Sequence, residues 1–335
     1  MAKLLPLQQQ LLKQISYSSC MAIHGCPRKM ELKKLLPRGF SDDIIFDFGD
    51  GDAVEGAAPE LEKKIAGNAT FAYGKAVGTG IQEWLVSHDR GKAIFATFMA
   101  WDVDLDDESQ LRVKKTFETA VLAVQKFASI QSMSMNLDDY ELMYYEGKPA
   151  IELGFRIRLP HGFVYRGFID AVLRNKYTGE IIVLEAKTTG MRFVNAAQYQ
   201  NSEQGVSYAL VLDKLFGKMS SYSVLYCAYL TMLERWETFL FPKSPAQRAE
   251  WFGNTFNDVE TVTNWIEHEY FPRRGECCAA YGKACEFIDT CHLDMQEFYV
   301  SEAQAQKLLA AEEVAGKYVA DITLDELIQA QLDME

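Results

Sequence analysis

The sequence is poor in basic residues and has no long apolar run. Its 335 residues include 34 lysines and arginines against 47 aspartates and glutamates, which gives a formal net charge of −13. This balance excludes a protein that coats nucleic acid with a broadly basic surface, so affinity for a polyanion has to come from local positive patches. Because no run of about 18 apolar residues is present, no membrane-spanning helix is expected.

Several common motifs are also missing. Gly74 and Lys75 are followed by Ala76, without the spaced upstream glycine of a phosphate-binding loop, which excludes a P-loop NTPase. The acidic, glycine-rich stretch 40–59 predicts an exposed loop with a short strand, and it lacks the ligand spacing of an EF-hand. Pro6 and several glutamines interrupt the start before a secretory apolar region forms, so we expect a cytoplasmic protein without a membrane partner, in the host cytoplasm if the gene is a phage gene.

What the sequence does contain is a pair of apolar segments, GFIDAVLR and EIIVLEAK, joined by the turn-forming residues NKYTG. If Asn175 and Glu180 close a four-residue loop, the numbers of paired residues add up to 355, and Asp170 lies opposite Glu185. Lys187 lies two residues further on, and the two-residue period of a strand places it on the same face.

Two carboxylates and an ammonium group therefore converge at one end of this hairpin. Because both faces of the strands are apolar, we expect helices on both faces and a cleft in front of the charged groups. Two close carboxylates repel each other unless a proton or a cation binds, and oxygen ligands suit Mg²⁺ or Mn²⁺. The alternative is a salt bridge at the sheet surface, in which Lys187 pairs with Glu185 or Asp170.

The periodicity of the middle of the chain predicts the order helix, three strands, helix, strand, which is an α/β (α+β) fold with a mixed sheet flanked by helices. We expect an N-terminal helical segment at 1–59, a core at 60–245 with a helical insertion at about 91–135, and C-terminal helices at 246–335. Within these, the expected elements are helices at 60–88, 195–216 and 246–269, strands at 150–159, 162–174, 180–187 and 221–232, and two helical segments in 301–335.

This order and these motifs resemble the PD-(D/E)XK nucleases, and within them the RecB-like group with an iron–sulfur cluster, which includes CRISPR-associated and phage exonucleases. The αβββαβ order is that family's core, GFID and EAK look like its second and third motifs, and Gln204 and Tyr208 match its QxxxY. The resemblance implies a site that holds Mg²⁺ or Mn²⁺ on Asp170, Glu185 and the backbone carbonyl of Ala186. It also implies the catalytic residues Asp170, Glu185, Lys187, Gln204 and Tyr208.

Seven cysteines in a cytoplasmic chain do not indicate a disulfide framework. The segment SYSSCMAIHGCPRKMEL resembles the family's CPRK segment, and CAAYGKACEFIDTC resembles its C-terminal cysteine segment. The resemblance implies that a 4Fe–4S cluster joins the two ends of the chain through Cys26, Cys278, Cys285 and Cys291. Four thiolates can also bind Zn²⁺, and the spacing leaves the choice open. Cys20 and Cys277 remain as spare thiols, and Cys227 is expected to be an inert core thiol.

The sequence departs from the family pattern at two positions. Ile169 precedes Asp170 where the family name has proline, which leaves the ligand in place. Gln82 occupies the position of a metal-binding histidine, and its weaker amide ligand shifts the preference towards Mg²⁺. Glu152 resembles an auxiliary acid that some members have in the preceding strand. The expected DNA contacts are Arg28, Lys29 and Arg166.

The function implied by the resemblance is a metal-dependent deoxyribonuclease, an exonuclease that releases 5′-phosphorylated products from single-stranded DNA ends. Its role would lie in recombination, repair or phage DNA processing. Three alternatives stay open: an inactive iron–sulfur subunit that binds DNA or assembles with partners, an endonuclease or nickase of the same chemistry, and a zinc-stabilised scaffold.

Overall fold

The structure is a computed structural model that describes residues 3–37, 69–101, 113–132, 135–217, 222–280, 283–315 and 318–332. The acidic stretch 40–59 and its expected strand lie outside these residues. The chain forms two compact units: unit 1 contains residues 1–66, 160–165 and 257–316, and unit 2 contains residues 67–159, 166–256 and 317–335. The division into three consecutive segments stays a prediction.

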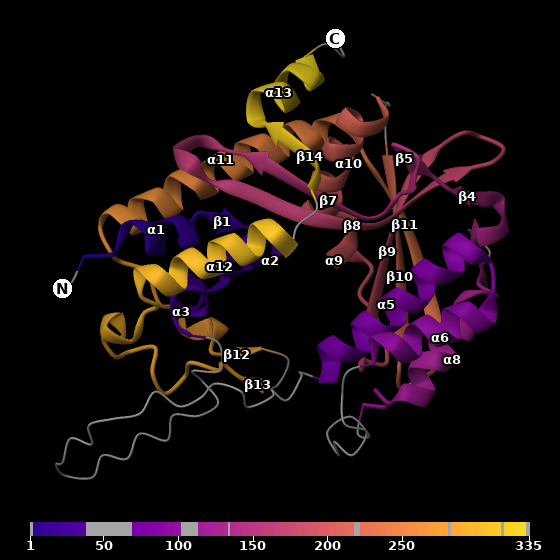
Figure 1. Ribbon diagram of the computed structural model, residues 1–335, viewed down its shortest axis with the longest axis horizontal. Coiled ribbons are helices and arrows are strands. Elements are labelled where there is room, and N and C mark those ends of the chain that lie inside the picture. The colour runs from indigo at the N-terminus through magenta and orange to yellow at the C-terminus, as the bar shows by residue number, and fades with distance from the viewer. Residues whose placement is uncertain are drawn as a thin grey trace. The chain divides into compact units, whose positions relative to one another are not determined.

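Unit 2 is built around a mixed sheet with the strand order β11-β10-β9-β8-β7-β14 (Figure 1). The strands are β7 (Ile151–Arg158), β8 (Val164–Asn175), β9 (Ile181–Thr189), β10 (Tyr222–Leu230), β11 (Arg235–Lys243) and β14 (Tyr318–Thr323). β8 runs antiparallel to β9, β9 is parallel to β10, and β14 is parallel to β7. Short strands complete the unit: β2 (Gln131–Ser132), β3 (Met135–Asn136), β4 (Tyr140–Leu142), β5 (Tyr144–Tyr145) and β6 (Lys148–Pro149).

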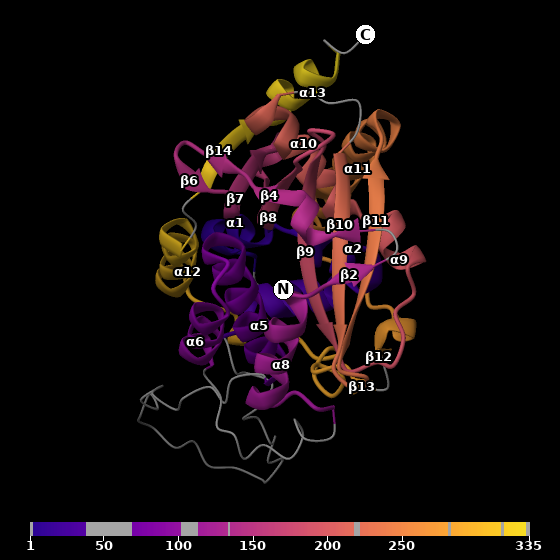
Figure 2. The same ribbon diagram turned by 90° about the vertical axis from the view of Figure 1, so that its right-hand side faces the viewer.

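Helices cover both faces of this sheet. Figure 2 shows α5 (Ala69–Ser87), α6 (Arg90–Ala100) and α8 (Phe117–Phe127) gathered side by side. Tyr73 and Val77 of α5 are fully buried in one core with Leu184 of β9 and Leu225 of β10. Strand residues alternate between faces, so α10 (Glu203–Phe216), which contacts Val224 through Gly205, covers the opposite face. The predicted order of helix, three strands, helix and strand is confirmed, as is the mixed sheet with helices on both sides.

Three features differ from the prediction. β11 forms a hairpin with β10 where no strand was expected, because its polar and apolar residues do not alternate strictly. β14 is a strand between α12 (Glu302–Ala315) and α13 (Leu324–Leu332), in a stretch expected to be helical. The helix expected at 195–216 is interrupted at Asn201 and Ser202, which separate α9 (Ala197–Gln200) from α10.

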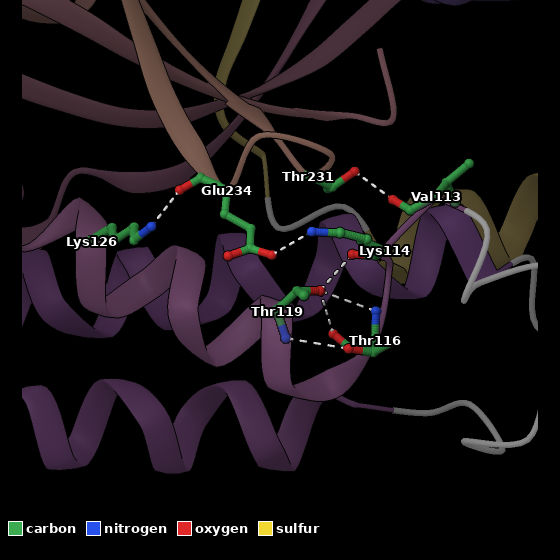
Figure 3. A network of polar contacts seen from close by, with 7 residues as sticks. All are labelled: Val113, Lys114, Thr116, Thr119, Lys126, Thr231 and Glu234. Atoms are coloured by element: carbon green, nitrogen blue, oxygen red, sulfur yellow. Dashed lines mark hydrogen bonds and ion pairs between the residues drawn. The ribbon is translucent and has the colours of Figure 1, made fainter. Parts of the chain in front are cut away.

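A network of polar contacts fastens the turn between β10 and β11 to the start of α8 (Figure 3). Lys114 Nζ donates to Glu234 Oε1 at 2.8 Å. Thr231 Oγ1 donates to the carbonyl of Val113 at 2.6 Å, and Thr231 N donates to the carbonyl of Thr189 at 3.0 Å. These bonds fix the end of β9, two residues beyond Lys187.

Unit 1 is largely helical. It contains α1 (Pro6–Leu12), α2 (Tyr17–Gly25), α3 (Pro27–Leu35), α12 and the end of α11 (Pro245–Glu267), with the short strands β12 (Ala279–Ala280) and β13 (Lys283–Ala284). β1 (Gln14–Ile15) pairs in parallel with the first residues of β8, Val164 and Tyr165, which belong to this unit. No helix in the described parts of the chain has the length and apolar character needed to cross a lipid bilayer.

Candidate active site

The hairpin of β8 and β9 has the register that the sequence predicts. Ala171 pairs with Leu184, and the ladder continues towards the turn. There, Asn175 N donates to the carbonyl of Glu180 at 2.8 Å, and Gly179 N donates to the carbonyl of Asn175 at 2.9 Å. Gly179 has a φ of +74°, a conformation that glycine adopts without steric cost. The four-residue loop is therefore confirmed.

This register brings Asp170, Glu185 and Lys187 together. Asp170 Oδ2 accepts a hydrogen bond from Ala186 N at 2.9 Å. Lys187 Nζ donates to Glu185 Oε1. Glu185 is 2% exposed, whereas the side chain of Lys187 is 38% exposed, so the site opens to solvent at the lysine. Glu185 Oε2 is buried and has no hydrogen-bond partner among the described residues.

The charges in this site strongly affect one another. The pKa of Asp170 is raised well above its usual range, first because the carboxyl is removed from water and then because Glu185 lies close to it; Glu152 adds to the effect. Burial acts to lower the pKa of Lys187, but Glu185 and Asp170 outweigh it, and the net shift is upwards. Lys187 is therefore positively charged between two acids, one of which ionises with difficulty.

Gln204 and Tyr208, on the α10 helix that packs against one face of the sheet, contact this site. Gln204 Nε2 lies 3.2 Å from Glu185 Oε1 and 2.7 Å from Tyr208 Oη. The ring of Tyr208 meets the ring of Phe155 edge to face, with centroids 6.1 Å apart. Gly167 makes room for Phe155, because a Cβ at this position would lie 2.7 Å from Phe155 Cζ. The glycine of GFID thus allows the packing that supports Tyr208 and Gln204.

Gln82 and Glu152 lie together beside these groups. Gln82 Nε2, on α5, donates to Glu152 Oε1 at 2.6 Å. Glu152 has a φ of +48° within β7, which is uncommon for a residue with a side chain. The amide of Gln82 therefore binds an acid of the same site, and its role as a metal ligand stays a prediction.

The donor set of Asp170 and Glu185 fits a divalent cation. Within the described ranges, the second oxygen of Glu185 has no hydrogen-bond partner. Burial and the nearby carboxylate of Glu185 raise the pKa of Asp170. A divalent ion relieves both conditions by supplying positive charge to oxygen ligands. Across the described residues, no group of three or more His, Cys, Asp or Glu side chains is arranged to hold a metal ion. A metal site on Asp170, Glu185 and the carbonyl of Ala186 therefore stays a prediction.

Tyr199 lies beside this site and was missed by sequence analysis: its ring stacks on Tyr226, the β10 partner of Glu185. Its phenol is one of the groups that raise the pKa of Lys187, after Glu185 and Asp170 and against the lowering effect of burial. It lies five residues before Gln204 and belongs to α9 rather than α10. No spacing rule in the sequence marks it, because the break at Asn201 and Ser202 separates it from the helix that carries Gln204 and Tyr208.

The four predicted cluster ligands all belong to unit 1, but within the described residues they are not arranged as a metal-binding group, so the cluster stays a prediction. The pKa of the Cys291 thiol is raised by burial and then by Cys278, Cys285 and Cys26, while Arg273 opposes the shift. Cys285 N donates to the carbonyl of Cys278 at 2.7 Å, which continues the pairing of β12 with β13. None of the seven cysteines, all of which lie in the described residues, forms a disulfide. Thiols that disfavour one another's ionisation fit a shared metal centre, which requires thiolates.

The other cysteines differ in their surroundings. The Sγ of Cys277 would lie 3.8 Å from a Cβ at Gly25, so this thiol is beside the residue that precedes Cys26. Cys20 is buried in α2. Cys227 is fully buried in β10, and burial raises its pKa, as expected for an inert core thiol.

The expected DNA contacts have varied surroundings. Arg28 donates to Glu31 Oε2 at 2.6 Å and to the carbonyls of Cys291 and Leu293, so it acts as a structural residue of unit 1. Lys29 lies 3.5 Å from Glu286 and keeps a partly exposed side chain. Arg166 is half-buried in β8. A role of these residues in DNA binding stays a prediction.

Comparisons with known proteins give little beyond this geometry. No protein-family model matches the chain. No curated protein matches it either. Among solved structures, the chain is similar to a crystal structure of a candidate exonuclease from Eubacterium rectale, with a TM-score of 0.41 and 11% identity over 83% of this chain and 92% of that chain.

Proposed function

We propose that this protein is a metal-dependent DNA nuclease that hydrolyses phosphodiester bonds from DNA ends. The observation that carries the proposal is the convergence of Asp170, Glu185 and Lys187, with a buried carboxylate oxygen of Glu185 that has no hydrogen-bond partner in the part of the chain that the structure describes. Two acids and a lysine that open to solvent on one side offer a place for a cation and an anionic substrate together.

Asp170, Glu185 and the carbonyl of Ala186 would hold Mg²⁺ or Mn²⁺. A bound ion of this kind polarises a phosphate oxygen and makes a water molecule a better nucleophile. Lys187, whose pKa is raised by the acids beside it, would donate to the phosphate as negative charge develops on it. Gln204 holds the carboxylate of Glu185 in place, and Tyr208 fixes Gln204.

The finer assignments rest on the resemblance of the motifs. We propose action on single-stranded ends, products with a 5′ phosphate, and a role in recombination, repair or phage DNA processing. We also propose a 4Fe–4S cluster on Cys26, Cys278, Cys285 and Cys291, with Zn²⁺ as the alternative occupant.

A second candidate is an inactive subunit that keeps the fold and the cysteine centre and binds DNA without cutting it. The hydrogen bond between Gln82 and Glu152 favours this candidate, because the family's imidazole ligand is missing and one carboxylate is occupied by an amide.

The decisive experiment is to incubate linear single-stranded, linear double-stranded and circular DNA with the protein, with and without Mg²⁺ or Mn²⁺. We expect cleavage only with metal and only of linear DNA. Lys187→Ala should lower the rate about 100-fold or more, since it removes a charged donor to the transition state. Lys92→Ala, which changes an exposed lysine of α6, is the matched control.

Each other outcome supports a different conclusion. Cleavage of circular DNA would indicate an endonuclease or nickase. DNA binding without cleavage would indicate the inactive subunit. Full activity of Lys187→Ala would exclude the proposed site. Iron, zinc and acid-labile sulfide analysis of the purified protein distinguishes a 4Fe–4S cluster from a single zinc ion.

A further inference from the structure

The loop between β9 and α9, residues 190–196, directly follows the strand that carries Lys187. β9 ends at Thr189, two residues after Lys187. Because an extended chain spans at most about 3.6 Å per residue, the Cα of Phe193 lies within about 22 Å of the Cα of Lys187. The connectivity of the chain therefore places this loop beside the candidate active site.

The loop also leaves the edge of the sheet at which ligands bind in open folds. β9 and β10 are parallel, and Thr189 pairs with Leu230 at their common carboxyl end. In open sheets with parallel strands, ligands bind in the crevice outside the carboxyl ends of the strands. The loop after β9 therefore has the position of a ligand-binding loop.

Hydrogen bonds and close packing hold the start of this loop. The carbonyl of Thr189 accepts from Thr231 N at 3.0 Å, and Met191 N donates to Thr189 Oγ1 at 3.1 Å. Gly190 packs against Val113, because an added Cβ would lie only 3.1 Å from the Cβ of that valine. The first residues of the loop are thus fixed against the polar network that joins β9 to α8.

The end of the loop is held at the start of α9. Asn195 Oδ1 accepts a hydrogen bond from Ala197 N at 3.1 Å, and the carbonyl of Asn195 accepts one from Gln198 N at 3.2 Å. The residues 191–194 are therefore held at both ends.

Two large apolar side chains of this held segment are in solvent. Met191 is 47% exposed, and Phe193 is 68% exposed. Arg192, between them, is exposed as well, and within the described ranges it forms no ion pair. Apolar side chains that stay in water do not stabilise the fold, and grouped together beside a site they indicate a surface that a ligand covers.

The charge of this stretch fits an anionic ligand. The residues 186–202 include two basic side chains and no acid, although the whole chain has a net charge of −13. The network that fixes the end of β9 adds Lys114 and Lys126, with one carboxylate, that of Glu234 (Figure 3). A polyanion is therefore attracted to this edge of a chain that is acidic as a whole.

From these observations we infer that the loop 190–196 is a platform for single-stranded DNA, on which Phe193 stacks against a base and Arg192 binds a phosphate. The inference rests on the proposed function, because it gives the substrate a second contact next to the phosphate that is cut. Aromatic rings stack on every kind of base, so the contact is independent of sequence. It favours an unpaired strand, because the bases of a duplex are already stacked on one another.

The test measures binding by fluorescence anisotropy, with a labelled single-stranded oligonucleotide and Ca²⁺ in place of Mg²⁺. Phe193→Ala should bind about tenfold more weakly, the effect of one lost base stack, and Phe193→Trp should bind at least as tightly as the wild type. Tyr177→Ala is the matched control. It removes an aromatic side chain that is 80% exposed in the turn at the other end of the β8–β9 hairpin, and it should bind like the wild type.

Two further probes separate the ring from the charge. An oligonucleotide of the same length that has sugars and phosphates but no bases should bind equally to the wild type and to Phe193→Ala. Arg192→Gln should reduce the slope of log affinity against log salt concentration by about 0.7, the value for one phosphate contact of a single strand. Phe193→Ala should leave this slope unchanged.

The outcomes distinguish the platform from the nuclease function. Equal affinity of the wild type and Phe193→Ala for DNA with bases would overturn the platform, and cleavage by the wild type would then still support the nuclease. A tenfold loss on the strand without bases would also overturn it, because the ring would not act through a base. Binding that depends on Phe193, without any cleavage by the wild type, would support the platform and overturn the nuclease function.

Discussion

Lys243 is the residue whose chemistry depends most directly on how the chain packs. Its ammonium group is buried, is bound by two carbonyls and has a pKa lowered from 10.5 to about 8 by burial. A folded-state pKa below the unfolded value means that the folded protein releases the proton first. The neutral form of Lys243 therefore contributes stability that is present above pH 10.5 and is lost as the pH falls through about 8.

This linkage predicts a pH-dependent effect of Lys243→Met. At pH 7 the variant should have a midpoint of thermal unfolding about 2 °C or more above the wild type, because a buried charge is replaced by an apolar chain of similar volume. The difference should shrink between pH 8 and pH 10.5, the two pKa values of the lysine. Thermal unfolding followed by circular dichroism from pH 6 to 10.5 checks this. A variant that is less stable than the wild type at every pH would contradict it.

The positions of some site residues could be predicted from the sequence, and those of others could not. Asp170, Glu185 and Lys187 could be placed together because apolar alternation and the turn at Asn175 fix the register of a local hairpin. Tyr199 and Lys243 could not be placed in this way. In the sequence, a lysine after FLFP resembles any exposed lysine. Its burial depends on the close approach of α10.

Among the elements, α5 shows how one position sets a helix contact. A Cβ at Gly80 would lie 2.1 Å from Thr97 Oγ1 of α6, 2.7 Å from Val124 Cγ2 of α8 and 3.2 Å from the carbonyl of Ala93. A Cβ at Gly78 of the same helix would have no described atom within 4 Å. Both glycines lie within α5, but only Gly80 is packed closely against neighbouring helices.

We expect Gly80→Ala to destabilise unit 2 by about 1–3 kcal/mol, because the added methyl group separates α5 from its neighbours. Gly78→Ala should be neutral or stabilising by about 0.5–1 kcal/mol, because alanine is the better helix former. Urea denaturation of both variants gives the comparison. Equal effects of the two substitutions would mean that α5 does not pack as closely as described.

The order of the core helices and strands could be predicted from the sequence, whereas some boundaries and one strand could not. Long apolar segments and the turn at 160–162 gave the strands of the core. β14 was missed because a strand of six residues between helices gains its identity only by pairing with β7, more than 150 residues earlier in the chain. The break before α10 was missed because Asn201 and Ser202 are tolerated within helices.

At the scale of the whole molecule, the main feature is that unit 1 is built from segments that lie far apart in the sequence. The unit combines residues 1–66, 160–165 and 257–316, and the four cysteines that we propose as ligands come from the first and the last of these segments. A shared centre on these thiols would stabilise the unit by closing a long loop.

Cys285→Ser is therefore expected to weaken unit 1 and leave unit 2 intact. Amide hydrogen exchange read by mass spectrometry should show faster exchange in 3–37 and 283–315, and unchanged exchange in β9 and β10. Cys277→Ser is the matched control, and it should exchange like the wild type. Faster exchange of unit 1 in Cys277→Ser, with unchanged exchange in Cys285→Ser, would show that Cys277 is a ligand in place of Cys285.

The segmented make-up of unit 1 also bears on synthesis. When a nascent chain has left the ribosome only as far as residue 256, the strands from β7 to β11 are all present, but the last segment of unit 1 has not been made. The N-terminal helices must then wait for that segment, although they were translated first. β14 is translated later still, so the edge of β7 that it covers stays open until translation is nearly complete.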